Sequence, residues 1–146
     1  MTTPPTSAFS QPVPTYLRAI RLATAAMAAF AALLYLLIGF GVLRVVEVGP
    51  DDPSLLWFGL PAGVAFLFGA VVMLVSERTI LWVLGAVFQV FAISAYFGVA
   101  ADREPAYEFW GIVLRVVQTL ILVALVVLLA RYPTPARPRA AGRRRA

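Results

Sequence analysis

The sequence predicts an all-α integral membrane protein: a four-helix bundle whose transmembrane helices alternate up, down, up and down, with both termini in the cytoplasm. Hydrophobic residues make up 62% of its 146 residues and charged residues only 13%, which is far from the balance of a soluble globular protein. The charged residues also fall mainly between four apolar runs. Each run is long enough to cross a hydrocarbon core of about 30 Å, because an α-helix rises about 1.5 Å per residue.

The four apolar runs locate the helices of a transmembrane domain. Three runs carry no charge and have 22, 24 and 23 residues, at positions 22–43, 53–76 and 79–101. The fourth run has 22 residues, at positions 109–130, and contains one charge, Arg115. With their flanks, the runs predict a domain at 16–132 with helices over about 16–44, 55–76, 79–101 and 106–132. The turn between the second and third helices is so short that we expect these helices to be antiparallel neighbours.

The two ends of the chain have a different composition. Residues 1–15 contain four prolines with several Thr and Ser, and residues 133–146 are rich in Arg and Pro. Neither segment has enough apolar residues to build a core, so both are predicted to be disordered cytoplasmic tails. The last arginines are expected to bind anionic lipid headgroups, at about 1 kcal/mol per basic residue, and no specific nucleic acid. These residues are Arg143, Arg144 and Arg145.

The arginines also set the predicted orientation, since cytoplasmic loops carry an excess of basic residues. All twelve basic residues are Arg. Nine of them lie on one side of the runs: Arg18, Arg21, Arg78, Arg131, Arg137, Arg139, Arg143, Arg144 and Arg145. The other side has only Arg44 and Arg103, together with most of the acidic residues. This asymmetry predicts that both termini lie in the cytoplasm. The absence of Lys and Asn is typical of G+C-rich coding, so we expect a bacterial protein that lies in the lipid bilayer of the inner membrane.

The residue types that the chain lacks exclude several functions. It has no Cys and no His, which removes disulfide exchange, thiolate or imidazole metal sites and histidine-ligated haem. No Asp or Glu lies inside an apolar run, which argues against a proton-driven antiporter with a membrane-buried carboxylate. Groups for general acid and base catalysis are equally scarce. We therefore expect no enzymatic activity, no metal and no cofactor.

The fourth helix carries the most informative polar stripe. Helical spacing places Glu108, Gly111, Arg115, Gln118 and Thr119 on one face. One interpretation is an outward-facing anion or headgroup site, with Arg115 as the fixed cation and Gln118 and Thr119 as hydrogen-bond donors. The preferred interpretation is structural: an ion pair with Glu108 or with the acidic residue at position 104 that holds the helix in register.

The other helices contribute one further polar residue and several small ones. Gln89 lies near mid-membrane on a face of the third helix with Gly85, Ala92 and Tyr96. We prefer a hydrogen bond from Gln89 to another helix, to Gln118 or Tyr35, over a substrate contact. Small side chains let helices approach closely, and the sequence does not distinguish packing within the chain from dimerisation. The predicted packing residues are Ala28, Tyr35, Gly39, Gly59, Gly63 and Gly85.

Two functions follow from these patterns. The first is a non-enzymatic membrane component that associates with copies of itself or with other membrane proteins through its small-residue faces. The alternative is a carrier or channel that binds a small solute, an anion or a lipid in an outward-facing pocket around Arg115. The surroundings of the Arg115 side chain discriminate between them.

Overall fold

The computed structural model describes residues 13–43, 53–100 and 108–132, and within these ranges it contains four α-helices and no strand. The helices are α1 (Thr15–Gly39), α2 (Pro53–Val75), α3 (Thr79–Ala100) and α4 (Phe109–Arg131). Each is long and apolar enough to cross a membrane. This confirms the all-α class and the four candidate membrane spans.

The first helix is shorter than predicted, because α1 ends at Gly39 rather than near residue 44. The chain turns there in a Schellman motif, in which Gly41 adopts a left-handed conformation with φ of 69°. The Val42 N–H donates to the Leu37 carbonyl and the Gly41 N–H to the Ile38 carbonyl, both at 2.9 Å. Hydropathy remains high through this turn, so an apolar run alone does not locate it.

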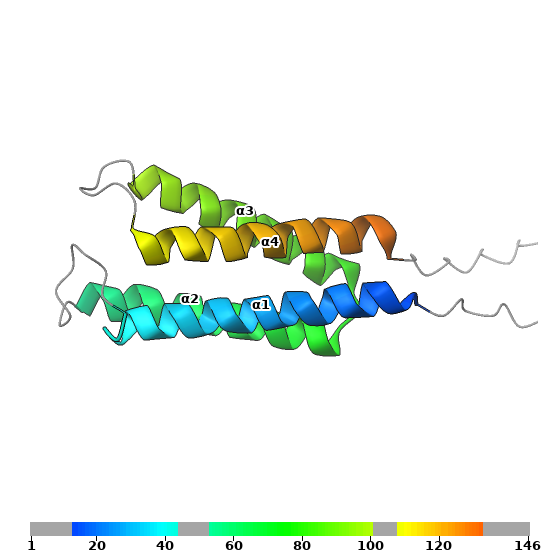
Figure 1. Cartoon of the computed structure of the whole chain (residues 1–146), viewed down its shortest axis with the longest axis horizontal. Coiled ribbons are helices and arrows are strands. Elements are labelled where there is room, and N and C mark those ends of the chain that lie inside the picture. Colours follow the sequence, from blue (N-terminus) through cyan, green and yellow to red (C-terminus); the bar gives the residue numbers. More distant parts are fainter. Residues whose placement is uncertain (1–12, 44–52, 101–107, 133–146) are drawn as a thin grey trace, which may run out of the picture.

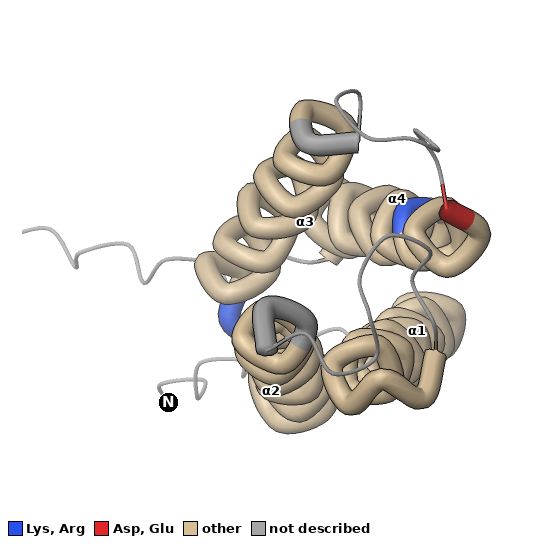
Figure 2. Tube along the Cα trace, turned by 90° about the vertical axis from the view of Figure 1, so that its left-hand side faces the viewer, with Lys and Arg blue, Asp and Glu red and all other residues tan. Residues whose placement is uncertain are grey.

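The helices are arranged as two pairs, α1 with α2 and α3 with α4 (Figures 1 and 2). Packing of α1 against α4 joins the pairs. Although only residues 76–78 separate α2 from α3, these two helices make few contacts with each other. The short link therefore does not produce the close α2 and α3 packing that the sequence suggested, because α2 packs mainly on α1 and α3 packs mainly on α4.

Small residues form the contact between α1 and α2. A Cβ atom added to Gly59 would lie 2.8 Å from the backbone nitrogen of Gly39, and one added to Gly63 would lie 2.8 Å from the Leu36 side chain. No side chain larger than hydrogen fits at Gly59 unless the helices move apart. Two of the predicted packing glycines thus meet each other within the chain.

One end of the bundle is held by side chains from three segments. Arg21 of α1 forms an ion pair with Glu77 of the α2 and α3 link at 2.7 Å, and it also donates to the Leu74 carbonyl at 3.0 Å. The hydrogen bond from Arg21, followed by that from Tyr132, lowers the pKa of Glu77. The start of α1 and the end of α4 lie together at this end of the bundle (Figure 1).

Aromatic packing closes the core at the same end. Trp82 of α3 is fully buried, and its ring meets the edge of Tyr132 with centroids 4.7 Å apart. Leu17 of α1 and Leu128 of α4 are also fully buried. By contrast, large apolar side chains cover the outer surface, in agreement with four helices apolar enough to cross a membrane. Examples with more than half of their surface exposed are Phe58, Phe68, Phe91 and Phe109.

Candidate functional site

Arg115 of α4 is buried between three helices, with 7% of its surface exposed. Its Nη1 donates to the backbone carbonyl of Ala92 in α3 at 2.8 Å, and its Nη2 donates to the Tyr35 hydroxyl of α1 at 2.9 Å. The ring of Tyr96 lies against the guanidinium, 4.4 Å from Cζ to the ring centroid. Gln118 joins the group through its own hydrogen bond to Tyr35 at 3.0 Å. We refer to Arg115, Tyr35, Gln118, Ala92 and Tyr96 as the arginine cluster.

The charge of Arg115 has no carboxylate partner in the part of the chain that the structure describes. The ion pair found there is between Arg21 and Glu77, at the other end of the bundle. Glu108, the predicted partner, forms no salt bridge with Arg115, and its buried Oε1 has no hydrogen-bond partner among the described residues. The other predicted partner, at position 104, lies outside the described residues.

Several polar atoms of the cluster have unused hydrogen-bonding capacity. The Arg115 Nε and the Gln118 Oε1 are both buried without a hydrogen-bond partner among the described residues. The Tyr35 oxygen already accepts from Arg115 and Gln118, so its own O–H is left to act as a donor. The Gln118 Oε1 is an acceptor, so the surplus donors of the arginine cluster are the Arg115 Nε–H and the Tyr35 O–H. A fixed positive charge with surplus donors is the chemistry that binds an anion.

Tyr35 is the residue that connects the cluster to the apolar core. Its ring stacks on Phe66 of α2 with centroids 5.4 Å apart, and Phe66 in turn meets Phe88 of α3 at 5.7 Å. The sequence placed Tyr35 on a packing face and did not connect it with Arg115. Tyr96 and Ala92 were grouped with Gln89 by helical spacing. Matching this face of α3 with the polar stripe of α4 could have identified Ala92 and Tyr96 as neighbours of Arg115.

Besides Glu108, two residues of the predicted polar stripe make no hydrogen bond with the guanidinium of Arg115 among the described residues. Thr119 is exposed, and its hydroxyl donates to the backbone carbonyl of Arg115 within α4 at 2.8 Å. Gly111 lies against the Tyr96 ring, since a Cβ atom there would come within 2.9 Å of ring atoms. The glycine therefore makes room for the tyrosine that covers Arg115.

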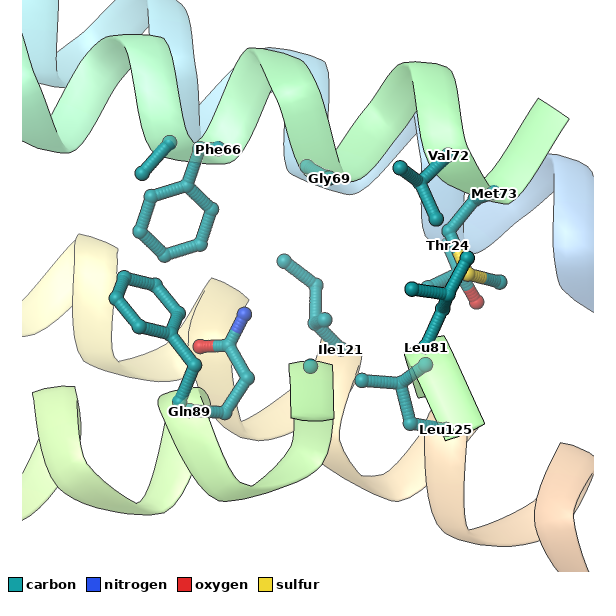
Figure 3. A pocket seen from close by; sticks show the side chains of 13 residues that line it. Thr24, Phe66, Gly69, Val72, Met73, Leu81, Gln89, Ile121 and Leu125 are labelled. Carbon is teal, nitrogen blue, oxygen red and sulfur yellow. The ribbon is translucent and has the colours of Figure 1, made fainter. Parts of the chain in front are cut away.

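Gln89 lies one helical turn from the cluster and faces a different space. It is 4% exposed and its Oε1 has no partner among the described residues. The side-chain hydrogen bonds described for Tyr35 and Gln118 are with Arg115 and with each other, so neither residue makes the predicted bond to Gln89. Instead, Gln89 lines a cavity of about 80 Å³ between the two helix pairs (Figure 3). The predicted packing residues Ala28 and Gly85 line the same cavity.

The described residues contain no group of three or more acidic side chains that could hold a metal ion. The arginines predicted to bind lipid headgroups, Arg143, Arg144 and Arg145, lie outside the described residues. No protein-family model, no curated protein and no solved structure matches the chain. Proposals for its function therefore depend on the arginine cluster and the cavity.

Proposed function

We propose that this chain is a non-enzymatic protein of the bacterial inner membrane that binds an anion through Arg115 from the outer side. In this proposal the four helices cross the bilayer alternately and both termini are cytoplasmic. The distribution of arginines supports this orientation: Arg18, Arg21 and Arg131 lie at the end of the bundle shared by the start of α1 and the end of α4. The arginine cluster then lies nearer the outer surface, about 10 Å along α4 from Glu108.

The orientation can be tested by cysteine labelling, because the chain has no native Cys. Single variants Ser54→Cys, at the start of α2, and Thr79→Cys, at the start of α3, mark opposite ends of the bundle. In intact spheroplasts, a membrane-impermeant maleimide is expected to label Ser54→Cys directly and Thr79→Cys only after permeabilisation. The reverse pattern would place both termini outside.

The observation that carries the anion proposal is the buried guanidinium without a carboxylate among the described residues. A charge at the centre of a membrane helix costs about 2.5–3.5 kcal/mol on insertion scales. A hydrogen bond between membrane helices offsets only about 0.6–2 kcal/mol. The contacts with Tyr35, Ala92 and Tyr96 offset much of this cost, but none of them supplies an opposite charge. A bound anion would supply both the opposite charge and acceptors for the surplus donors.

Arginine suits this role because it stays charged at every physiological pH and presents a planar set of donors to carboxylate or phosphate oxygens. The contact with the Tyr96 ring stabilises the cation without competing for those donors. Nothing in this arrangement requires bond making or breaking, so the proposal is binding, as for a carrier or channel, rather than catalysis.

The anion proposal is tested by thermal unfolding of the protein in phosphatidylcholine nanodiscs. Chloride, acetate and phosphate are titrated separately, and each titration is repeated with the variants so that the effect of ionic strength cancels. At least one of them is expected to raise the Tm of the wild type, since a ligand at a hundred times its Kd stabilises by about 2.7 kcal/mol. Arg115→Gln should lose this response. Arg131→Gln removes the same charge from the exposed end of α4 and should retain it.

An equal response of wild type and Arg115→Gln would rule out binding at Arg115. The same conclusion follows if none of the three anions stabilises the wild type and no larger anion does so either. Circular dichroism of each variant confirms that its helices are intact before the titration is interpreted.

A second function, lateral association with another membrane protein or a second copy, is favoured by the exposure of α3. In its most apolar 18-residue segment, only 11% of α3 is buried inside the bundle, whereas 50% of the corresponding segment of α1 is buried. A single cysteine at Phe91, which is 69% exposed on α3, should cross-link to a second copy in native membranes if copies associate there. Val123→Cys on the exposed face of α4 is the control. Equal cross-linking at both positions would indicate random collision.

A further inference from the structure

The cavity between the helix pairs has a buried floor and an exposed rim. Its floor is formed by α1 and α4, where Thr24, Ala28, Ile121 and Leu125 are all buried. Its rim is formed by α2 and α3, where lining side chains such as Ala65 and Phe88 are exposed. Because α2 and α3 make few contacts, the cavity opens sideways between them. In a membrane that side faces lipid rather than water.

The cavity is apolar except at one end. Figure 3 shows Gln89 at the end near Phe66, whereas Thr24 and Met73 lie at the other end. The Thr24 hydroxyl is already used, since it donates to the Ile20 carbonyl at 2.8 Å. The Gln89 side chain is 96% buried and its amide oxygen has no partner among the described residues. One unused polar group therefore marks one end of an otherwise apolar space.

This polar end lies next to the arginine cluster. Ala92, whose carbonyl accepts from Arg115, is three residues after Gln89 on α3. On α4, Ile121 of the cavity floor is six residues after Arg115, or about 9 Å along the axis. Along the bundle, the cation of Arg115 is thus followed by the amide of Gln89 and then by the apolar part of the cavity, so polarity decreases in that direction.

We infer that the anion is the headgroup of an amphiphile: a carboxylate or phosphate that binds Arg115 and carries an alkyl tail that enters the cavity past Gln89. This inference rests on the proposed function and names its ligand class. In the proposed orientation the charged head lies in the outer half of the bundle and the tail crosses the bilayer midpoint, because the cavity runs from Gln89 near the middle of α3 to Met73 and Leu81 near the cytoplasmic ends of α2 and α3. The sideways opening lets such a molecule enter from the membrane.

The volume limits how much of the tail is enclosed. The cavity of about 80 Å³ is roughly half the size of the apolar cavity of about 150 Å³ that binds benzene in an engineered protein. It therefore holds the first few methylene groups, and the remainder of the tail leaves between α2 and α3 into lipid. A second tail would lie outside the cavity in the same way.

The inference is tested with alkyl phosphates of increasing length, from methyl through butyl to octyl phosphate. The protein is held in phosphatidylcholine nanodiscs and binding is measured as the rise in Tm. For the wild type, affinity is expected to increase about fourfold per methylene group until the cavity is full, which corresponds to about 0.8 kcal/mol per buried CH₂. Beyond that length, additional methylene groups lie in the bilayer in the wild type and in the variants alike. The ratio of wild-type affinity to variant affinity therefore stays constant.

Two glycine variants separate the tail from the head. Gly69 lines the cavity and has no atom within 4 Å of an added Cβ, so Gly69→Leu fills the cavity without a clash at its first atom. Gly98 on α3 has the same open surroundings but does not line the cavity, so Gly98→Leu is the matched control. Gly69→Leu should lose the gain from butyl over methyl phosphate and keep the methyl phosphate affinity. Gly98→Leu should keep both.

The outcomes distinguish the two proposals. If Gly69→Leu keeps the full chain-length gain, the tail does not use this cavity and the inference is wrong, while anion binding at Arg115 stands. If neither methyl phosphate nor a longer homologue stabilises the wild type, the inference is wrong, and the anion proposal fails with it only if chloride, acetate and phosphate are also without effect. If nanodisc mass shows a second copy that Gly69→Leu removes, the opening receives a helix and the inference is overturned. Ala65→Phe, which obstructs the rim, repeats the test if Gly69→Leu does not fold.

Discussion

The Tyr35 hydroxyl accepts a hydrogen bond of 2.9 Å from Nη2 of Arg115, across a sequence separation of 80 residues. This contact links the first helix to the last and joins the two helix pairs inside the bundle. The same hydroxyl accepts from Gln118. A single phenol oxygen therefore satisfies two buried donors, and its removal gives the first prediction.

Tyr35→Phe is expected to destabilise the fold by about 1–2 kcal/mol, because it leaves donors of Arg115 and Gln118 unpaired in an apolar interior. The ring contacts with Phe66 are preserved, so the change isolates the hydroxyl. Stability is measured by unfolding in mixed micelles of rising SDS fraction. Tyr16→Phe, at an exposed tyrosine of α1, should change little. Equal effects of the two changes would show that the hydroxyl contributes no net stability.

Gly59→Ala is expected to destabilise the α1 and α2 pair by about 1–3 kcal/mol, as overpacking of a close contact does. The added methyl would approach the backbone of Gly39 at 2.8 Å. Gly98→Ala has open space around the new methyl and should be neutral or stabilising by up to about 1 kcal/mol. Unfolding in SDS compares them. A neutral Gly59→Ala would mean that the helices separate at little cost.

Trp82→Ala is expected to cost about 3–5 kcal/mol, the range for removing a large buried aromatic side chain. Trp82 is fully buried, whereas Trp57 of α2 is 79% exposed. Trp57→Ala therefore serves as the control and should have a much smaller effect on the SDS midpoint. Similar losses for both variants would contradict the buried position of Trp82 at the end of the bundle.

The ion pair between Arg21 and Glu77 predicts a pH dependence of stability. Hydrogen bonds from Arg21 and then Tyr132 lower the pKa of Glu77 below its ordinary value of 4.5. A carboxyl group with a lowered folded-state pKa stabilises the fold above its ordinary value and loses this contribution as the pH falls to the lowered pKa. The stability advantage of wild type over Glu77→Gln should therefore be constant near neutral pH and shrink below pH 4.5. It is measured from the Tm of both proteins across this range.

The Glu77 effect is expected to be small, because its side chain is 59% exposed and solvent screens the pair. Arg21→Gln removes the same ion pair from the other side and should flatten the pH dependence in the same way. If the wild type is still more stable than Glu77→Gln by the same amount at acid pH, the ion pair is not the source of that stability difference.

Composition and charge placement predicted the elements well, because a membrane span is a local property of about 20 apolar residues. All four helices lie where the apolar runs do. Local turn geometry was less accessible: the left-handed Gly41 ends α1 within a stretch that is still apolar. The partners of Arg115 could not be derived either. Helical spacing groups residues of one helix, but Tyr35 and Ala92 come from two other helices.

The sequence by itself determined that the chain forms four apolar helices, that Arg115 is the one charge inside a run, and that Gln118 lies on the same helix face as Arg115. Only the tertiary structure decided that α2 and α3 stand apart, that Glu108 does not pair with Arg115, and that Gln89 faces a cavity. The physical reason is that hydropathy acts along one helix. Which faces meet depends on the fit of side chains between helices, such as Gly39 against Gly59.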